Sequence, residues 1–189
     1  MKRIAIFASG SGTNAENLIR HFRTNKAGRV ELVLTNRPSA GVIGRARSLD
    51  VETVVFNREQ FYQTGEILAL LRERGIDFVV LAGFLWLVPS DILDAYEGRV
   101  VNIHPALLPG YGGKGMYGHH VHEAVLASGD TESGITIHYV NRAYDEGAII
   151  FQAFCPVLED DTPDSLASRI HTLEYEHFPR EIEKLLDQF

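Results

Sequence analysis

Two polar residues at the end of an apolar segment have types and spacing that suit catalysis. Asn102 and His104 lie two positions apart in the segment Val-Val-Asn-Ile-His, residues 100–104, and residues two apart on a strand point to the same face. An amide donor beside an imidazole suits a reaction that builds negative charge on an oxygen and moves a proton. The alternative is that Asn102 caps a turn and His104 is an ordinary strand-end histidine.

Asp145 is a third candidate, in the turn at 141–147 between two late apolar segments. Asp and Gly also favour turns for purely local reasons. If this turn folds over the end of the strand that contains His104, the carboxylate raises the pKa of the imidazole and favours its protonated form. A meeting of Asn102, His104 and Asp145 is therefore an expectation that depends on the fold.

A glycine turn follows the first apolar segment. Residues 10–15, Gly-Ser-Gly-Thr-Asn-Ala, match the loose dinucleotide pattern G-x-G-x-x-G/A. No carboxylate ends the second predicted strand, and no Gly-Lys-Ser/Thr follows the glycines, so a dinucleotide site and a phosphate-loop NTPase are both disfavoured. Exposed amides of Gly12, Thr13 and Asn14 at a helix N-terminus suit one phosphate monoester. A tight turn that needs glycine for a positive φ is the structural alternative.

Alternating elements must position these residues. Apolar segments and helical spacing predict strands at 3–8, 30–35, 53–56, 78–82, 100–104, 134–140 and 148–157, and helices at 14–23, 42–49, 60–74, 90–96, 120–127 and 163–186. Segments that are apolar at almost every position indicate strands covered on both faces, as in a parallel sheet. We predict an α/β fold in one domain, residues 1–189: a doubly wound, mostly parallel, Rossmann-like sheet with an antiparallel C-terminal hairpin and a long C-terminal helix capped by Thr162.

The charge balance argues against a nucleic-acid surface. The chain of 189 residues has 18 Lys and Arg against 25 Asp and Glu, a formal net charge of −7, so no nucleic-acid partner is expected. No apolar run approaches the ~18 residues of a membrane span, and the N-terminal segment does not suit an export signal. The lone Cys155 excludes an intrachain disulfide and fits a reducing compartment. We expect a cytoplasmic protein.

A histidine cluster raises the question of a metal site. His119, His120, His122 and Glu123 lie at a predicted helix start. The chain has no His-Glu-x-x-His motif and a single cysteine, which disfavours both structural and catalytic zinc. We expect no metal, and we expect these side chains to make polar contacts at a partly solvated rim.

Five segments occur in a fixed order along nearly the whole chain, at 8–14, 81–84, 102–109, 134–138 and 145–150. Together they resemble the glycinamide ribonucleotide formyltransferase family of folate-dependent formyltransferases, and Asn-Ile-His-Pro with its downstream Asp is the most specific part. The resemblance implies direct transfer of a formyl group from 10-formyltetrahydrofolate to the amine of 5-phosphoribosylglycinamide, in purine biosynthesis. The implied partners are these small molecules, with the chain as a monomer or homodimer.

The resemblance also implies roles for individual residues. Asn102 and protonated His104 donate to the oxyanion, and His104 with Asp145 moves the proton from the attacking nitrogen to the leaving folate nitrogen. Implied contacts to the phosphate are Gly12, Thr13 and Asn14, and implied contacts to the rest of that substrate are His171 and Glu174. Implied folate contacts are Arg58, Leu85, Trp86, Leu87, Val88, Asn102, Asn141 and Tyr144.

Two departures from the family pattern and three alternatives remain. Trp86 stands where some members have an arginine, and the loop 110–118 is longer than in the shorter-looped members. A hydrolase of the same folate has a further N-terminal domain, for which 189 residues leave no room, and methionyl-tRNA formyltransferase adds a C-terminal RNA-binding domain. The third alternative is a non-catalytic nucleotide or NADP-binding module in which Arg37 contacts a phosphate.

Overall fold

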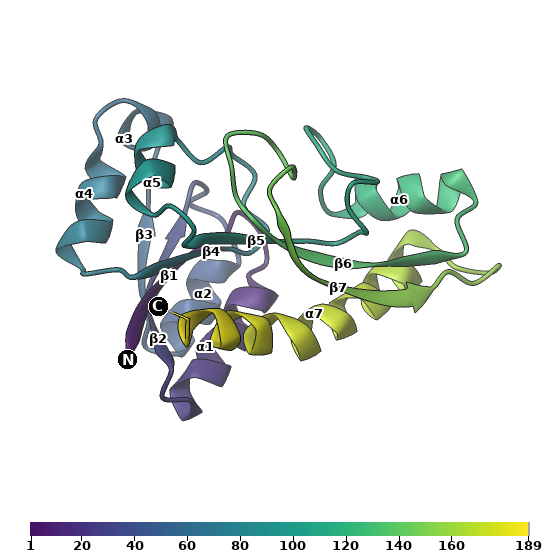
Figure 1. Ribbon diagram of the computed structural model, residues 1–189, viewed down its shortest axis with the longest axis horizontal. Coiled ribbons are helices and arrows are strands. Elements are labelled where there is room, and N and C mark those ends of the chain that lie inside the picture. Colours follow the sequence, from purple (N-terminus) through teal and green to yellow (C-terminus); the bar gives the residue numbers. More distant parts are fainter. Residues whose placement is uncertain (189) are drawn as a thin grey trace.

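The computed structural model describes residues 1–188, which form a seven-stranded sheet with helices on both faces (Figure 1). The strands are β1 (Lys2–Phe7), β2 (Gly28–Thr35), β3 (Glu52–Val55), β4 (Phe78–Leu81), β5 (Val100–His104), β6 (Glu132–Tyr139) and β7 (Ile149–Pro156). Their order in the sheet is β3-β2-β1-β4-β5-β6-β7. The predicted α/β class, with its mostly parallel sheet, is confirmed.

The direction of the strands reverses at β6 and again at β7. β1 to β5 pair in parallel, whereas β6 pairs antiparallel with both β5 and β7. The chain order also reverses beside β1, since β2 and β4 lie on its two sides. In open α/β sheets, ligands bind outside the carboxyl ends of the strands at such a switch point. The turns after β1, β4 and β5 therefore meet where a ligand site is expected.

The helices are α1 (Thr13–Thr24), α2 (Val42–Ser48), α3 (Arg58–Tyr62), α4 (Glu66–Glu73), α5 (Ser90–Ala95), α6 (His119–Ser128) and α7 (Pro163–Leu186). The side chain of Thr162 accepts from the Ser165 amide and Ser165 caps in return, so α7 begins as predicted. One prediction is wrong: the segment 60–74 contains parts of two helices. Gly65 adopts a left-handed φ of 69° and begins α4 there.

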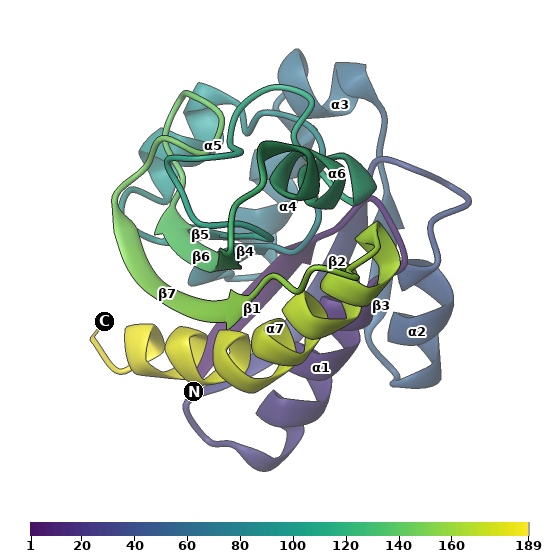
Figure 2. The same cartoon turned by 90° about the vertical axis from the view of Figure 1, so that its right-hand side faces the viewer.

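Two apolar layers cover the sheet. Leu18 of α1 and Phe178 of α7 pack on one face with Ile4 and Ile6 of β1, and Figure 2 shows α7 alongside α1. The opposite face holds side chains of α3, α4 and α5, including Phe61, Leu71 and Ile92. Burial of one such side chain stabilises the fold by about 2 kcal/mol. These two layers explain why the parallel strands are apolar at consecutive positions.

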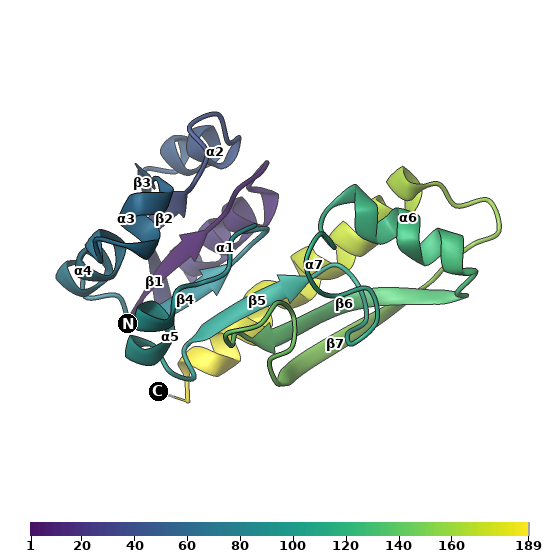
Figure 3. The same cartoon turned by 90° about the horizontal axis from the view of Figure 1, so that it is seen from above.

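The antiparallel part of the sheet, with α6, extends away from the first four strands (Figure 3). Its register places His138 directly opposite Asn102 and Thr136 opposite His104. Side chains at opposed positions lie on the same face and contact one another. β6 therefore supplies neighbours to both candidate residues of β5. Within residues 1–188, no helix has the length and apolar composition needed to cross a membrane.

Candidate active site

A cavity of about 1000 Å³ lies at the carboxyl ends of β1, β4 and β5. It is bounded by the glycine turn, the turn after β4, the loop after β5, the turn after β6 and the first half of α7. It brings together ten of the residues predicted from the sequence: Gly12, Thr13, Asn14, Leu85, Asn102, His104, Tyr144, Asp145, His171 and Glu174.

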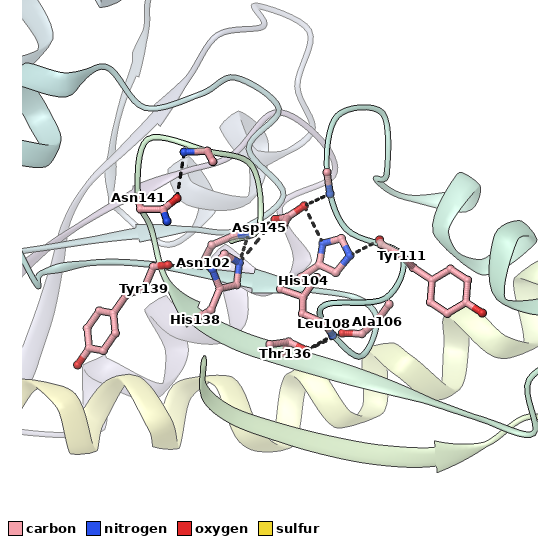
Figure 4. A network of polar contacts seen from close by, with 12 residues as sticks. Asn102, His104, Ala106, Leu108, Tyr111, Thr136, His138, Tyr139, Asn141 and Asp145 are labelled. Atoms are coloured by element: carbon pink, nitrogen blue, oxygen red, sulfur yellow. Dashed lines mark hydrogen bonds and ion pairs between the residues drawn. The ribbon is translucent and has the colours of Figure 1, made fainter. Parts of the chain in front are cut away.

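Asn102 makes two contacts through its amide nitrogen (Figure 4). Nδ2 lies 3.0 Å from Nε2 of His138 and 3.4 Å from Oδ1 of Asp145. The first contact follows from the β5–β6 register, because Asn102 and His138 are opposed. The second contact is long for a hydrogen bond, so it is the one that a ligand oxygen can replace at low cost.

His104 is 3% exposed and both of its ring nitrogens face oxygen atoms. Nε2 lies 2.7 Å from the carbonyl oxygen of Tyr111, and Nδ1 lies 3.6 Å from Oδ2 of Asp145. Burial lowers the pKa of His104 below its ordinary value and outweighs the opposing influence of Asp145 and the Tyr111 carbonyl. Asp145 does raise the pKa of His104, as the sequence predicts, but burial has the larger effect and the net shift is downward.

Asp145 connects the site to the loop after β5. Its Oδ2 accepts a hydrogen bond of 3.0 Å from the Gly113 amide, and its Oδ1 lies 3.6 Å from Nε2 of His138. Burial alone would raise the pKa of Asp145, but the contacts with His138, His104 and Gly113 together lower it. The carboxylate is therefore ionised at neutral pH and faces both histidines.

Thr136 of β6 fixes the start of the loop after β5. Its hydroxyl donates to the carbonyl of Ala106 and accepts from the amide of Leu108, at 2.7 and 2.9 Å. Gln152 of β7 donates to Thr136 and to the Leu108 carbonyl. Farther along, His119 lies 3.1 Å from Asp164, which joins the starts of α6 and α7 at the rim.

The glycine turn is held in place from α2. Gly12 has a φ of 80°, and a Cβ at this position would lie 2.5 Å from Val42. The carbonyl of Gly10 accepts from the Val42 amide, and the carbonyl of Ser11 accepts from Arg45. α1 begins directly after the turn, at Thr13. Free amides at a helix start can bind an anion, so phosphate binding at this turn stays a prediction.

Next to this turn, α7 contributes a buried polar group. Oε2 of Glu174 lies 2.9 Å from Nδ2 of Asn14 and 2.8 Å from Nδ1 of His171. The hydrogen bond with Glu174 raises the pKa of His171. His122 of α6 lines the same cavity, and burial lowers its pKa to about 4. Oδ1 of Asn14 and Nδ1 of His122 are buried and have no hydrogen-bond partner among residues 1–188.

Several residues implied for folate lie apart from the cavity lining. Within residues 1–188, that lining omits Arg58, Trp86, Leu87, Val88 and Asn141. The Arg58 guanidinium lies 5.1 Å from the centre of the Trp86 ring, a cation–π arrangement. Val88 is buried in the core. The oxygen of the Asn141 side chain accepts from Ala143 inside its own turn.

Two contacts of the site were not predicted from the sequence. His138 lies in a predicted strand two residues after Thr136, the same spacing as Asn102 and His104, and that spacing could have identified it. The carbonyl of Tyr111 is a backbone atom, and Tyr111 adopts a left-handed φ of 56°. No residue type predicts such a contact. Among the described residues, no three His, Cys, Asp or Glu side chains form a metal-binding group.

The fold and the site define a doubly wound α/β protein whose polar residues meet at the switch point of the sheet. The formyl transferase family matches residues 2–182, and the chain belongs to this family.

Named relatives agree with this assignment. "Phosphoribosylglycinamide formyltransferase, chloroplastic" of Arabidopsis thaliana is 42% identical over 182 residues, 93% of this chain and 62% of that protein. The trifunctional purine biosynthetic protein adenosine-3 of Drosophila melanogaster is 37% identical over 98% of this chain and 14% of its own length. This chain therefore spans less than two thirds of either relative. The crystal structure of phosphoribosylglycinamide formyltransferase from Bacillus halodurans matches with a TM-score of 0.88 and 38% identity, over 98% of this chain and 95% of that one.

Proposed function

We propose that this chain, as one formyltransferase domain (residues 1–189), transfers the formyl group of 10-formyltetrahydrofolate to the amine of 5-phosphoribosylglycinamide in purine biosynthesis. The observation that supports this most directly is that Asn102, His104 and Asp145 meet in the cavity that also contains the glycine turn. A reacting carbonyl and a phosphate group can occupy one such cavity together. Membership of the formyl transferase family and the names of the relatives support the same reaction.

The phosphoribosyl substrate fits the side of the cavity next to α1 and α7. The amides of Gly12, Thr13 and Asn14 are placed to receive its phosphate, and the positive end of the α1 dipole favours the anion. The hydrogen bond with Glu174 raises the pKa of His171 and so favours its protonated form, which attracts an anion near this position. Glu174 is an acceptor for the hydroxyl or amine groups of the same molecule.

The proton transfer follows from the tautomer of His104. The Tyr111 carbonyl can only accept, so Nε2 carries the hydrogen in the neutral ring and Nδ1 is the free base. We assign Nδ1 to take the proton from the attacking amine. Asp145, at 3.6 Å, then stabilises the imidazolium until the proton passes to the leaving folate nitrogen. An Asn102 N–H donates to the oxygen of the tetrahedral intermediate.

The folate enters, in this account, between the turn after β4 and the turn after β6. Leu85 and Tyr144 line the cavity on these two sides. Arg58 and Trp86 stack on each other farther out, where they form a surface for the acidic tail of the folate. Leu87, Val88 and Asn141 act through the backbone of these two turns, since Val88 is buried and Asn141 bonds within its turn.

We propose that both substrates are small molecules, that no metal takes part, and that the chain works in a reducing compartment, the cytoplasm. Cys155 is buried and burial raises the pKa of its thiol, which fits a structural thiol.

A two-substrate spectrophotometric assay tests the proposal. The purified chain receives 10-formyltetrahydrofolate and 5-phosphoribosylglycinamide with EDTA present, and each substrate is omitted in turn. We expect the folate to lose its formyl group only when the amine is present, at a rate that EDTA leaves unchanged. Loss of the formyl group without the amine would identify a hydrolase. Binding of NADPH without any folate consumption would identify a nucleotide-binding module.

A further inference from the structure

His138 is buried in the site and is not used by the mechanism above. It is 2% exposed and lies on β6 opposite Asn102. Nδ1 has one partner, whereas Nε2 faces both Asn102 and, at 3.6 Å, Oδ1 of Asp145 (Figure 4). Nδ1 lies 2.9 Å from the backbone carbonyl of Tyr139, and Nε2 lies 3.0 Å from Nδ2 of Asn102.

The two short contacts favour one tautomer of His138, because the 3.6 Å separation of Nε2 from Asp145 is too long for a hydrogen bond. A carbonyl oxygen only accepts hydrogen bonds, so the hydrogen of the neutral ring is on Nδ1 and points to Tyr139. Nε2 then has a lone pair and needs a donor. The donor is the amide nitrogen of Asn102. If the Asn102 carboxamide were rotated by half a turn, its oxygen would face this lone pair and the bond would be lost.

The orientation of the carboxamide decides what Asn102 offers to a substrate. With one N–H bonded to His138, the other points to the side of Asp145 and His104, where it meets Oδ1 of Asp145 at 3.4 Å. A substrate oxygen can replace this long contact while the shorter bond to His138 persists. In the rotated carboxamide, the same side would present an oxygen, which repels a developing oxyanion.

We propose that His138 is a positioning residue, which holds the Asn102 carboxamide with an N–H rather than its oxygen toward the catalytic side of the cavity. The consequence for the reaction rests on the proposed formyl transfer. The orientation itself is a property of the free protein and is measured without any substrate.

Nitrogen-15 NMR of the wild-type protein, labelled at histidine, tests the tautomer directly. We expect the His138 signals at neutral pH to show a hydrogen on Nδ1 and a bare Nε2. A hydrogen on Nε2, alone or together with one on Nδ1, would overturn the proposal. This spectrum does not depend on activity, so the two proposals can fail separately. If the wild-type chain did not transfer the formyl group, the proposed function would be wrong, but the spectrum would still report the tautomer of His138.

Three variants test the effect on turnover. His138→Leu removes the acceptor, His138→Gln keeps an acceptor near the position of Nε2, and His138→Asn keeps one only near Nδ1. Loss of a whole oxyanion donor costs about 100-fold in rate. We therefore expect kcat of His138→Leu to fall by about 10-fold to about 100-fold, while the KM values for the folate and for the amine substrate stay within about twofold of the wild type. The Gln variant should recover most of this loss and the Asn variant should not. Equal loss in all three variants, or a loss in KM alone, would contradict a positioning role.

A double-mutant cycle separates positioning from general support of the fold. If His138 acts through Asn102, His138→Leu has no further effect on kcat once Asn102→Ala is present. If the two losses multiply, His138 acts independently of Asn102 and the proposal is wrong. Thermal unfolding of each variant shows whether it folds. If a variant does not fold, the NMR spectrum of the wild-type protein still tests the tautomer of His138 and therefore the proposal.

Discussion

Oδ2 of Asp145 lies 3.6 Å from Nδ1 of His104, in a site where burial lowers the pKa of the histidine. The carboxylate opposes that effect of burial, so removing its charge lowers the pKa of His104 further. In Asp145→Asn we expect kcat to fall and the acidic limb of the pH–rate profile to move to lower pH or to flatten, because His104 must be neutral to accept a proton. A profile measured between pH 4 and pH 9 checks this.

Asp94→Asn is the matched control for this charge change. Asp94 is exposed and pairs with Arg142 outside the cavity lining. Its variant should keep the wild-type profile. If Asp145→Asn also keeps the wild-type acidic limb, the aspartate has no part in the proton transfer.

The glycine turn tolerates no side chain at Gly12. A Cβ would lie 2.5 Å from Val42, and the φ of 80° disfavours any residue with a side chain. Gly12→Ala should lower the free energy of unfolding by about 2 kcal/mol or more and raise KM for the phosphoribosyl substrate. Gly44→Ala is the control, because among residues 1–188 no atom outside its chain neighbours and its own helix backbone lies within 4 Å of an added Cβ. Urea unfolding and steady-state kinetics of both variants distinguish a specific effect from a general one.

His122 makes stability depend on pH. Its pKa is about 4 in the folded protein and about 6.5 in an unfolded chain, so the unfolded state binds more protons between these values. Folding stability must therefore fall as the pH falls from about 6.5 toward 4, by about 2 kcal/mol at pH 5 from this residue alone.

Urea unfolding at pH 7 and pH 5 measures this effect. His122→Asn cannot titrate in this range, so the variant should lose about 2 kcal/mol less than the wild type on going from pH 7 to pH 5. Equal losses in the two proteins would show that His122 titrates normally in the folded state.

Local sequence patterns predicted those features of the site that arise within a single strand or a single turn. Asn102 and His104 share a face because they are two apart on β5, and Gly12 allows the turn before α1. The contact between Asn102 and His138 depends on the antiparallel register of β5 and β6. Single-strand patterns do not contain that register.

Burial and loop conformation account for the predictions that were wrong or incomplete. The pKa of His104 falls because the folded protein removes it from water, which a residue pair in the sequence does not reveal. Val88 follows a turn of the cavity lining, yet its own side chain is buried in the core. The helix predicted over 60–74 is interrupted because Gly65 adopts a left-handed conformation.

The central claim is that Asn102 donates to the formyl oxygen and His104 takes the proton of the attacking amine, while the glycine turn holds the phosphate elsewhere in the cavity. The most direct test compares kcat and KM of Asn102→Ala with those of the wild type, under saturating folate. Because the amide acts on the transition state, kcat should fall by about 100-fold while KM for 5-phosphoribosylglycinamide stays within about twofold. An unchanged kcat with a raised KM would show that Asn102 only binds substrate, and it would contradict the account.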